Sequence, residues 1–265
     1  MEKASDCGGG GGGCSANPKD EDSDHDDPMP PRTSKHKVVK NPTCFKCKAH
    51  GTFNYKNGII VCADCFKVSI VEHKYKGNLR KIGVRGREKN VFLVLLSGGV
   101  NSMCLAKVVA ESLLPGPSGR KMFYDASVLH VDETCFYPEE SSEENVKGLT
   151  RFCETLGLGL EVVALADFFG QEGIDLNELI LSLKDSGSCR EDFIRNFRRR
   201  AILEHCSKNG VKKLLSAENG DTLAKLAFTS LIKGKGYEML AEGSILTNFM
   251  DNPDIALCKP LKDCT

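Results

Sequence analysis

VFLVLLSGGVNSMCLAKVV, residues 91–109, joins a continuous apolar run to a glycine turn and then to a helix-like stretch. The run at 91–96 has the length and composition of a strand that is buried on both faces. Gly98 and Gly99 end that strand, and residues 103–113 follow with helical composition. A strand, a tight turn and a helix in this order are typical of α/β proteins with a parallel sheet.

The same alternation of strand and helix continues along the chain. Further strands are predicted at residues 126–131, 160–165 and 213–216. Further helices are predicted at residues 143–156, 191–208 and 221–232. The fold class predicted for residues 91–265 is therefore a doubly wound parallel α/β sheet with helices on both faces.

The glycine turn has the composition of a phosphate-binding loop. Gly98 and Gly99 permit close approach to the backbone, whose free N–H groups and helix dipole suit phosphate oxygens. Ser97 and Ser102 add hydroxyl donors, and Asn101 lies between them. The turn follows a strand at the sheet edge where open α/β sheets bind ligands. The alternative is an ordinary strand-to-helix turn that binds nothing.

Two Cys-x-x-Cys pairs, separated by fourteen residues, lie upstream at Cys44, Cys47, Cys62 and Cys65. Each pair brings two sulfurs to one ion, and two pairs close a tetrahedral shell of four thiolates. This spacing predicts a structural zinc site in a small module at residues 41–68. A pair of disulfides and an iron–sulfur site are the alternatives.

Charge is unevenly distributed along the chain, although the net charge of the whole protein is zero. Residues 1–40 combine a glycine run, acidic residues and prolines, which predicts a disordered leader. Residues 31–90 hold fifteen Lys or Arg and three Asp or Glu, and 69–90 are predicted to form a basic helix and linker. Such a block attracts polyanions, although an ordinary solvated surface is the alternative. No apolar run resembles a membrane span or secretory signal, so we expect a cytoplasmic protein without membrane contact.

The turn residues carry a family resemblance. Ser97-Gly98-Gly99-Val100-Asn101-Ser102 resembles the SGGxDS loop of the N-type ATP pyrophosphatases, or PP-loop enzymes, which include tRNA thiolation enzymes. These enzymes adenylate a carbonyl oxygen, and a nucleophile then displaces AMP. The resemblance implies an ATP site in which the loop holds pyrophosphate and Asp132 reaches the nucleotide. The family's loop Asp, which helps to place magnesium, is Asn101 here and lacks the charge that a hard cation favours.

A second family element is also only partly matched. The family's Gly-His-Asn-x-Asp-Asp corresponds to residues 217–222, where Asn219 and Asp221 are kept. Glu218 replaces the His, and Thr222 replaces the second Asp. The resemblance therefore implies a degenerate nucleotide site that includes Asp221.

The Arg-Arg helix of the family is similar to residues 197–203, with Arg198 and Arg199. Thiolating members carry a Cys-x-x-Cys just before these arginines. Here that stretch is residues 193–196, which contain no cysteine, and Cys189 stands alone upstream. The resemblance thus implies that the catalytic residues for sulfur transfer are absent.

The combination of a leader, a four-cysteine module, a degenerate loop and the motifs at 233–237 and 259–264 resembles one subfamily. It comprises the second subunits of cytosolic tRNA 2-thiolation complexes. The resemblance implies an accessory, non-catalytic partner in a heterodimer with the catalytic subunit, acting on wobble uridine 34 of the tRNAs for Lys, Glu and Gln. Sulfur would come through the ubiquitin-related modifier pathway. Such subunits continue well past the Lys-Pro-Leu turn at residues 259–261, whereas this chain stops five residues after Pro260, so we expect a chain truncated at its C-terminus.

Candidate tRNA contacts are the basic residues of the linker and of the Arg-Arg helix: Arg80, Lys81, Arg85, Arg87, Arg198 and Arg199. Two other functions remain open. One is an active enzyme that adenylates and thiolates tRNA uridine itself, against which the lost Asp and thiols argue. The other is a zinc-ribbon adaptor that does not bind RNA.

Overall fold

The computed structural model describes most of the chain beyond the leader. The described residues are 42–55, 58–84, 90–115, 124–137, 142–171, 173, 175–183, 187–250 and 252–264. The predictions for residues 1–40, for Arg85 and for Arg87 lie outside this part. No helix in the described ranges combines the length and apolarity needed to cross a bilayer.

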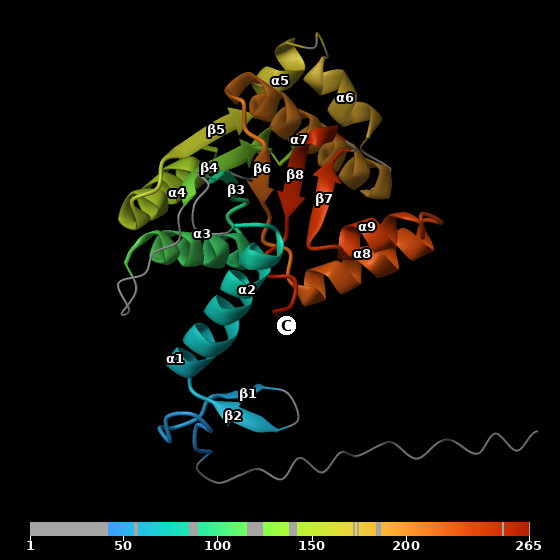
Figure 1. Ribbon diagram of the computed structural model, residues 1–265. Coiled ribbons are helices and arrows are strands. Elements are labelled where there is room, and N and C mark those ends of the chain that lie inside the picture. The colour runs from blue at the N-terminus through green and yellow to red at the C-terminus, as the bar shows by residue number, and fades with distance from the viewer. Residues whose placement is uncertain are drawn as a thin grey trace, which may run out of the picture. The chain divides into compact units, whose positions relative to one another are not determined.

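A six-stranded sheet forms the centre of the α/β part, in the order β5-β4-β3-β6-β8-β7 (Figure 1). The strands are β3 (Asn90–Leu95), β4 (Tyr124–Asp132), β5 (Leu160–Ala164), β6 (Lys213–Leu215), β7 (Leu246–Phe249) and β8 (Asn252–Cys258). Neighbouring strands run parallel except for β7, which is antiparallel to β8. The predicted parallel α/β fold is confirmed, except that β7 runs antiparallel to its neighbour.

Helices follow the strands as the alternating pattern predicts. The principal ones are α2 (His73–Lys81), α3 (Val100–Leu113), α4 (Ser142–Leu156), α5 (Leu165–Gln171), α6 (Leu176–Ser182), α7 (Gly187–Asn209), α8 (Gly220–Ile232) and α9 (Glu238–Gly243). A short 3-10 turn, η2 (Thr134–Phe136), follows β4. Sequence reasoning did not predict α5, α6, α9, β7 or β8.

Strand β3 explains why the sheet has two buried faces. Phe92, Val94 and Leu96 join the core on the side of α2, α3 and α4. Leu93 and Leu95 lie on the opposite side with α7. Figure 1 shows α3 below the sheet and α7 above it. Because successive side chains of a strand point to opposite faces, a strand covered on both sides must be apolar at nearly every position.

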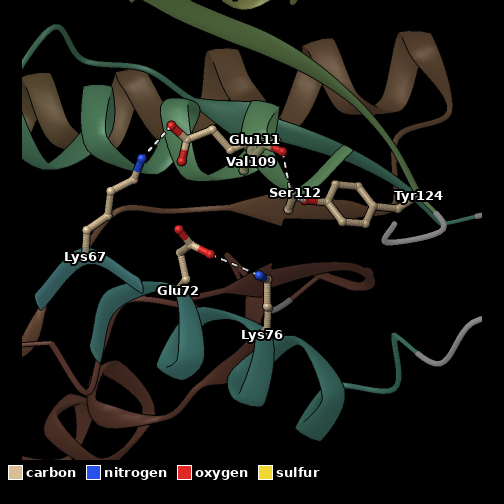
Figure 2. A network of polar contacts seen from close by, with 7 residues as sticks. All are labelled: Lys67, Glu72, Lys76, Val109, Glu111, Ser112 and Tyr124. Carbon is tan, nitrogen blue, oxygen red and sulfur yellow. Dashed lines mark hydrogen bonds and ion pairs between the residues drawn. The ribbon is translucent and has the colours of Figure 1, made fainter. Parts of the chain in front are cut away.

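Helix α2 is part of the core rather than a free linker. Tyr75 and Leu79 have no exposed surface, and the Tyr75 hydroxyl lies 2.6 Å from the Tyr124 hydroxyl. Just before α2, in the π-helical turn η1 (Lys67–Glu72), Lys67 Nζ lies 2.7 Å from Glu111 of α3 (Figure 2). These contacts fix the segment that follows the cysteine module against the α/β domain.

Candidate functional site

The phosphate-like loop connects the end of β3 to α3. Gly98 has φ +82°, a left-handed conformation that a residue with a Cβ adopts only with strain. Ser102 is buried, and its hydroxyl accepts the Ser97 N–H at 3.2 Å and donates to the Gly99 carbonyl at 2.9 Å. That hydroxyl therefore braces the loop from inside. Residues 97–101, at the N-terminus of α3, are exposed, as a phosphate-binding loop requires, and their binding of phosphate stays a prediction.

The N-terminus of α8 lies against this loop. Asn219 caps α8 by accepting hydrogen bonds from the Thr222 N–H at 3.0 Å and the Thr222 hydroxyl at 2.8 Å. The Asn101 side-chain amide lies 3.5 Å from that same hydroxyl. Asn101 and Thr222 each stand where the PP-loop family has an Asp, and the two positions are thus neighbours. Both side chains are neutral, so this contact brings no negative charge to the loop.

Asp132, at the end of β4, is buried and makes several hydrogen bonds. Its carboxylate accepts the Thr134 N–H at 2.9 Å, the Thr134 hydroxyl at 2.7 Å and the Ser142 hydroxyl. Burial by itself raises the pKa of Asp132, but the hydrogen bonds from Ser142 and Thr134 outweigh it and lower the pKa below its usual value. The carboxylate therefore ties β4 to η2 and to the start of α4, and its binding of a nucleotide stays a prediction.

Replacing Asp132 by Asn should destabilise the fold by about 1.5–3 kcal/mol at neutral pH, because charged hydrogen bonds are lost. The folded-state pKa is depressed, so this stability is present above the unfolded pKa of about 4 and fades as pH falls through the folded value. Urea unfolding of both proteins at several pH values measures the difference. Asp254→Asn, at an exposed carboxylate, is the control and should change little.

The Arg-Arg helix uses its arginines within the fold. Arg198 makes a two-pronged ion pair with Glu133, whose Oε2 lies 2.6 Å from Arg198 Nη2. The Arg199 guanidinium lies 5.6 Å from the centre of the Phe249 ring. Arg198 thereby links α7 to the end of β4, next to Asp132. Sequence reasoning missed Glu133, because its partner is 65 residues away.

The predicted contacts in α2 differ in their surroundings. Arg80 and Lys81 are both exposed. Lys81 also donates a hydrogen bond to the Asn78 side chain at 3.1 Å and lies 3.9 Å from the Asp263 carboxylate. The structure describes two of the four predicted linker contacts, Arg80 and Lys81. Of these two, only Arg80 forms no ion pair with another described residue.

Lys259, at the end of β8, lies beside the element at 217–222. It is buried, donates to the Glu242 carbonyl at 2.6 Å and lies 3.9 Å from Glu218 Oε2. Burial lowers the pKa of Lys259. Glu218 Oε2 is itself buried and accepts no hydrogen bond from the described residues. This loose pair shows that Glu218, where the family has His, interacts with the end of β8.

The four cysteines converge as their spacing predicts. Their Sγ atoms all lie within 4.8 Å of one another, and those of Cys47 and Cys62 are 3.5 Å apart. Strands β1 (Phe53–Tyr55) and β2 (Ile59–Val61) form an antiparallel hairpin between the two pairs. Gly51 lies so close to this hairpin that a Cβ there would clash with the Ile60 side chain.

The thiols of this cluster influence one another. A hydrogen bond from the Cys47 backbone N–H lowers the pKa of Cys44 to about 6. In contrast, hydrogen bonds with the side chains of Cys47 and then Cys62 raise the pKa of Cys65 to about 12. Four sulfurs this close cannot all be thiolates without a compensating cation, so the donor set fits a bound metal ion.

Comparison with known families completes the description of the site. The family model described as a PP-loop domain matches residues 69–265. The chain belongs to the PP-loop family. The match begins within η1, just before α2, in agreement with the burial of α2 in the α/β core. The fold is therefore that of a PP-loop domain, as the motifs predicted, and phosphate binding by the loop at residues 97–102 stays a prediction.

Two curated relatives confirm the resemblance to the cytoplasmic tRNA 2-thiolation protein 2 family. That protein from Dictyostelium discoideum is 28% identical over 211 residues, which cover 77% of this chain and 40% of the relative. Its Arabidopsis thaliana counterpart is 25% identical over 240 residues, covering 83% of this chain and 51% of the relative. The chain thus spans about half the length of the curated relatives it matches.

A solved structure shares the fold. The U34-tRNA thiolase NcsA from Methanococcus maripaludis, determined with its [4Fe-4S] cluster, superimposes with a TM-score of 0.63 at 20% identity. The match covers 84% of this chain and 68% of that chain.

Proposed function

We propose that this chain is an accessory subunit in the cytosolic 2-thiolation of wobble uridine 34 in the tRNAs for Lys, Glu and Gln. The carrying observation is the contact between Asn101 and Thr222 in an otherwise preserved PP-loop turn. Two neutral side chains at these positions leave the loop able to cradle phosphate through N–H groups but poor at holding magnesium. The test is whether the purified chain releases AMP in the presence of tRNA; none is expected.

The partner of the proposed subunit is the catalytic chain of the same complex. The absence of cysteine at residues 193–196 supports this division of labour, because no paired thiol precedes Arg198 to carry sulfur. Sulfur would then reach the catalytic chain through the ubiquitin-related modifier pathway, in the cytoplasm. An active thiolating enzyme would instead need a magnesium site at its nucleotide-binding loop and a pair of thiols that carry sulfur.

Zinc is the metal we propose for the four-cysteine cluster. Zn–S bonds of about 2.3 Å in a tetrahedron put the sulfurs roughly 3.8 Å apart, which suits four Sγ atoms that lie within 4.8 Å of one another. A [4Fe-4S] cluster places a separate iron behind each thiolate and spreads the sulfurs further. With four protein ligands the zinc would be structural, since no open position is left for chemistry.

The basic surface of the cysteine module and α2 is the proposed tRNA contact. Lys46 and Lys48 are exposed beside the cluster, and Arg80 is exposed on α2. The contacts of Tyr75 and Lys67 fix α2 and the turn that precedes it against the α/β domain. A fixed array of cations suits the regular phosphate spacing of an RNA backbone better than a flexible tail does.

Affinity for tRNA should therefore fall steeply with salt, with a log–log slope that grows with the number of phosphate contacts. Reversing the charge of Arg80, Lys81, Arg85 and Arg87 should weaken binding and flatten the slope, as measured by filter binding or fluorescence anisotropy. Lys212→Glu, at an exposed lysine before β6, is the control. Salt-independent binding, or no binding even with the partner present, would contradict the RNA contact.

A further inference from the structure

Helix α8 ends in an exposed surface that is both apolar and basic. The exposed fractions of Phe228, Leu231 and Ile232 are 67%, 52% and 86%. Lys225 is also exposed and lies one turn before Phe228. Positions separated by three and four residues share one face of a helix, so these four side chains lie together. Figure 1 shows α8 beside α9, beyond the β7 end of the sheet.

The turn after α8 adds to the same surface. Gly234 has φ +72°, so the chain leaves the helix in a tight turn. The backbone then passes close to the Leu231 side chain, since a Cβ at Gly236 would lie 3.4 Å from it. Lys235 and Tyr237 flank Gly236, and both are exposed. We call the surface that these side chains form the α8 patch: Lys225, Phe228, Leu231, Ile232, Lys235 and Tyr237.

The charge of the α8 patch favours an anionic ligand. Residues 225–237 hold three lysines and no Asp or Glu. The single acidic residue of α8 is Asp221, which lies two helical turns before Phe228. Within this stretch the exposed apolar side chains therefore have only cations beside them in the chain.

The carboxylate of Asp192, on α7, lies near the end of the α8 patch. Asp192 accepts a hydrogen bond from Lys233 at 2.6 Å. This hydrogen bond, and then the nearby charges of Arg195 and Lys235, lower the pKa of Asp192. Three cations thus surround one carboxylate, whose charge is compensated and does not cancel that of the patch.

Exposed aromatic rings among cations have the chemistry that binds unpaired nucleic acid. Unpaired bases stack on aromatic side chains, while lysines contact the phosphates between them. The centre of a protein interface is, in contrast, depleted of lysine. We infer that the α8 patch binds unpaired nucleotides of an RNA, which stack on Phe228 and Tyr237. This inference rests on the proposed function and deepens it, because the wobble uridine lies in an unpaired loop of its tRNA.

Fluorescence anisotropy with two RNA probes tests the inference on the full chain. One probe is the anticodon stem-loop of the tRNA for Lys, and the other is the same stem as a blunt duplex without unpaired nucleotides. Phe228→Ala and Tyr237→Ala should each weaken binding of the stem-loop by roughly fivefold or more and leave binding of the duplex unchanged, because stacking needs an unpaired base. Phe228→Trp should keep the affinity for the stem-loop. Leu181→Ala, at a side chain 70% exposed on α6, is the matched control and should change neither.

Charge reversal tests the lysines separately. Lys225→Glu and Lys235→Glu should each lower the log–log salt slope of stem-loop binding by about 1. An equal loss for both probes, or no loss from Phe228→Ala and Tyr237→Ala, would overturn the inference and leave the tRNA contact of α2 standing. Failure of both probes to bind would overturn it together with that contact. So would a stem-loop affinity that Phe228→Ala leaves unchanged while it breaks binding to a protein partner or to anionic vesicles, since the patch would then serve that ligand.

Discussion

Replacing Cys44 by Ser should unfold the cysteine module and release its metal. The module has a very small core of its own, with Cys44, Val61 and Ile70 as its buried apolar residues. Structural zinc in small modules contributes on the order of 10 kcal/mol, far more than three buried side chains supply. Loss of one ligand should therefore remove the order of residues 42–66 and expose them to proteolysis.

The measurement is metal content per chain, together with limited proteolysis and thermal unfolding. About one zinc per wild-type chain is expected, and the α/β domain should keep its own transition in the variant, because Tyr75 and Leu79 anchor α2 in that domain. Cys104→Ser, at an exposed cysteine outside the cluster, is the control and should retain the metal. Well-folded protein without zinc would rule out the zinc assignment, and iron in its place would favour the iron–sulfur alternative.

Deleting the gene should abolish 2-thiolation of wobble uridine, although we expect the isolated protein to catalyse no step of it. The purified chain should release no AMP or pyrophosphate with ATP and tRNA, because the contact between Asn101 and Thr222 supplies no charge for magnesium. Restoring the acid with Asn101→Asp should not create thiolation, since residues 193–196 still lack thiols. Mass spectrometry of tRNA nucleosides and a pyrophosphate assay measure the two effects.

Complementation separates the accessory role from catalysis. Wild-type protein and Ser97→Ala should both restore 2-thiolation to the deletion strain, because an accessory subunit does not need a reactive loop. Phe92→Asp, which places a charge in the core, is the control for loss of the folded chain. Robust AMP formation by the isolated protein that Ser97→Ala eliminates would instead establish the active-enzyme alternative.

Local patterns were sufficient for the central fold. The apolar run at 91–96 became β3 because both faces of that strand are covered, and the next two apolar runs became β4 and β5. The paired Cys-x-x-Cys spacing likewise predicted a four-sulfur cluster that the structure contains. Strand β8 escaped prediction because Pro253 and Asp254 interrupt its apolar pattern near its start.

Tertiary structure decided which of the predicted site residues make contacts within the fold. Arg198 binds Glu133, and Asp132 is saturated by Thr134 and Ser142, so these side chains hold the fold together as well as lying near the site. The periodicity of strands and helices depends on residues that are close in the chain. The sequence by itself therefore determined the predicted strands and helices and the group of four cysteines. An ion pair that joins residues far apart in the chain, such as that of Arg198 with Glu133, depends on how the elements pack. Local sequence patterns do not predict such packing, because the groups that make contact are close together only in the folded chain.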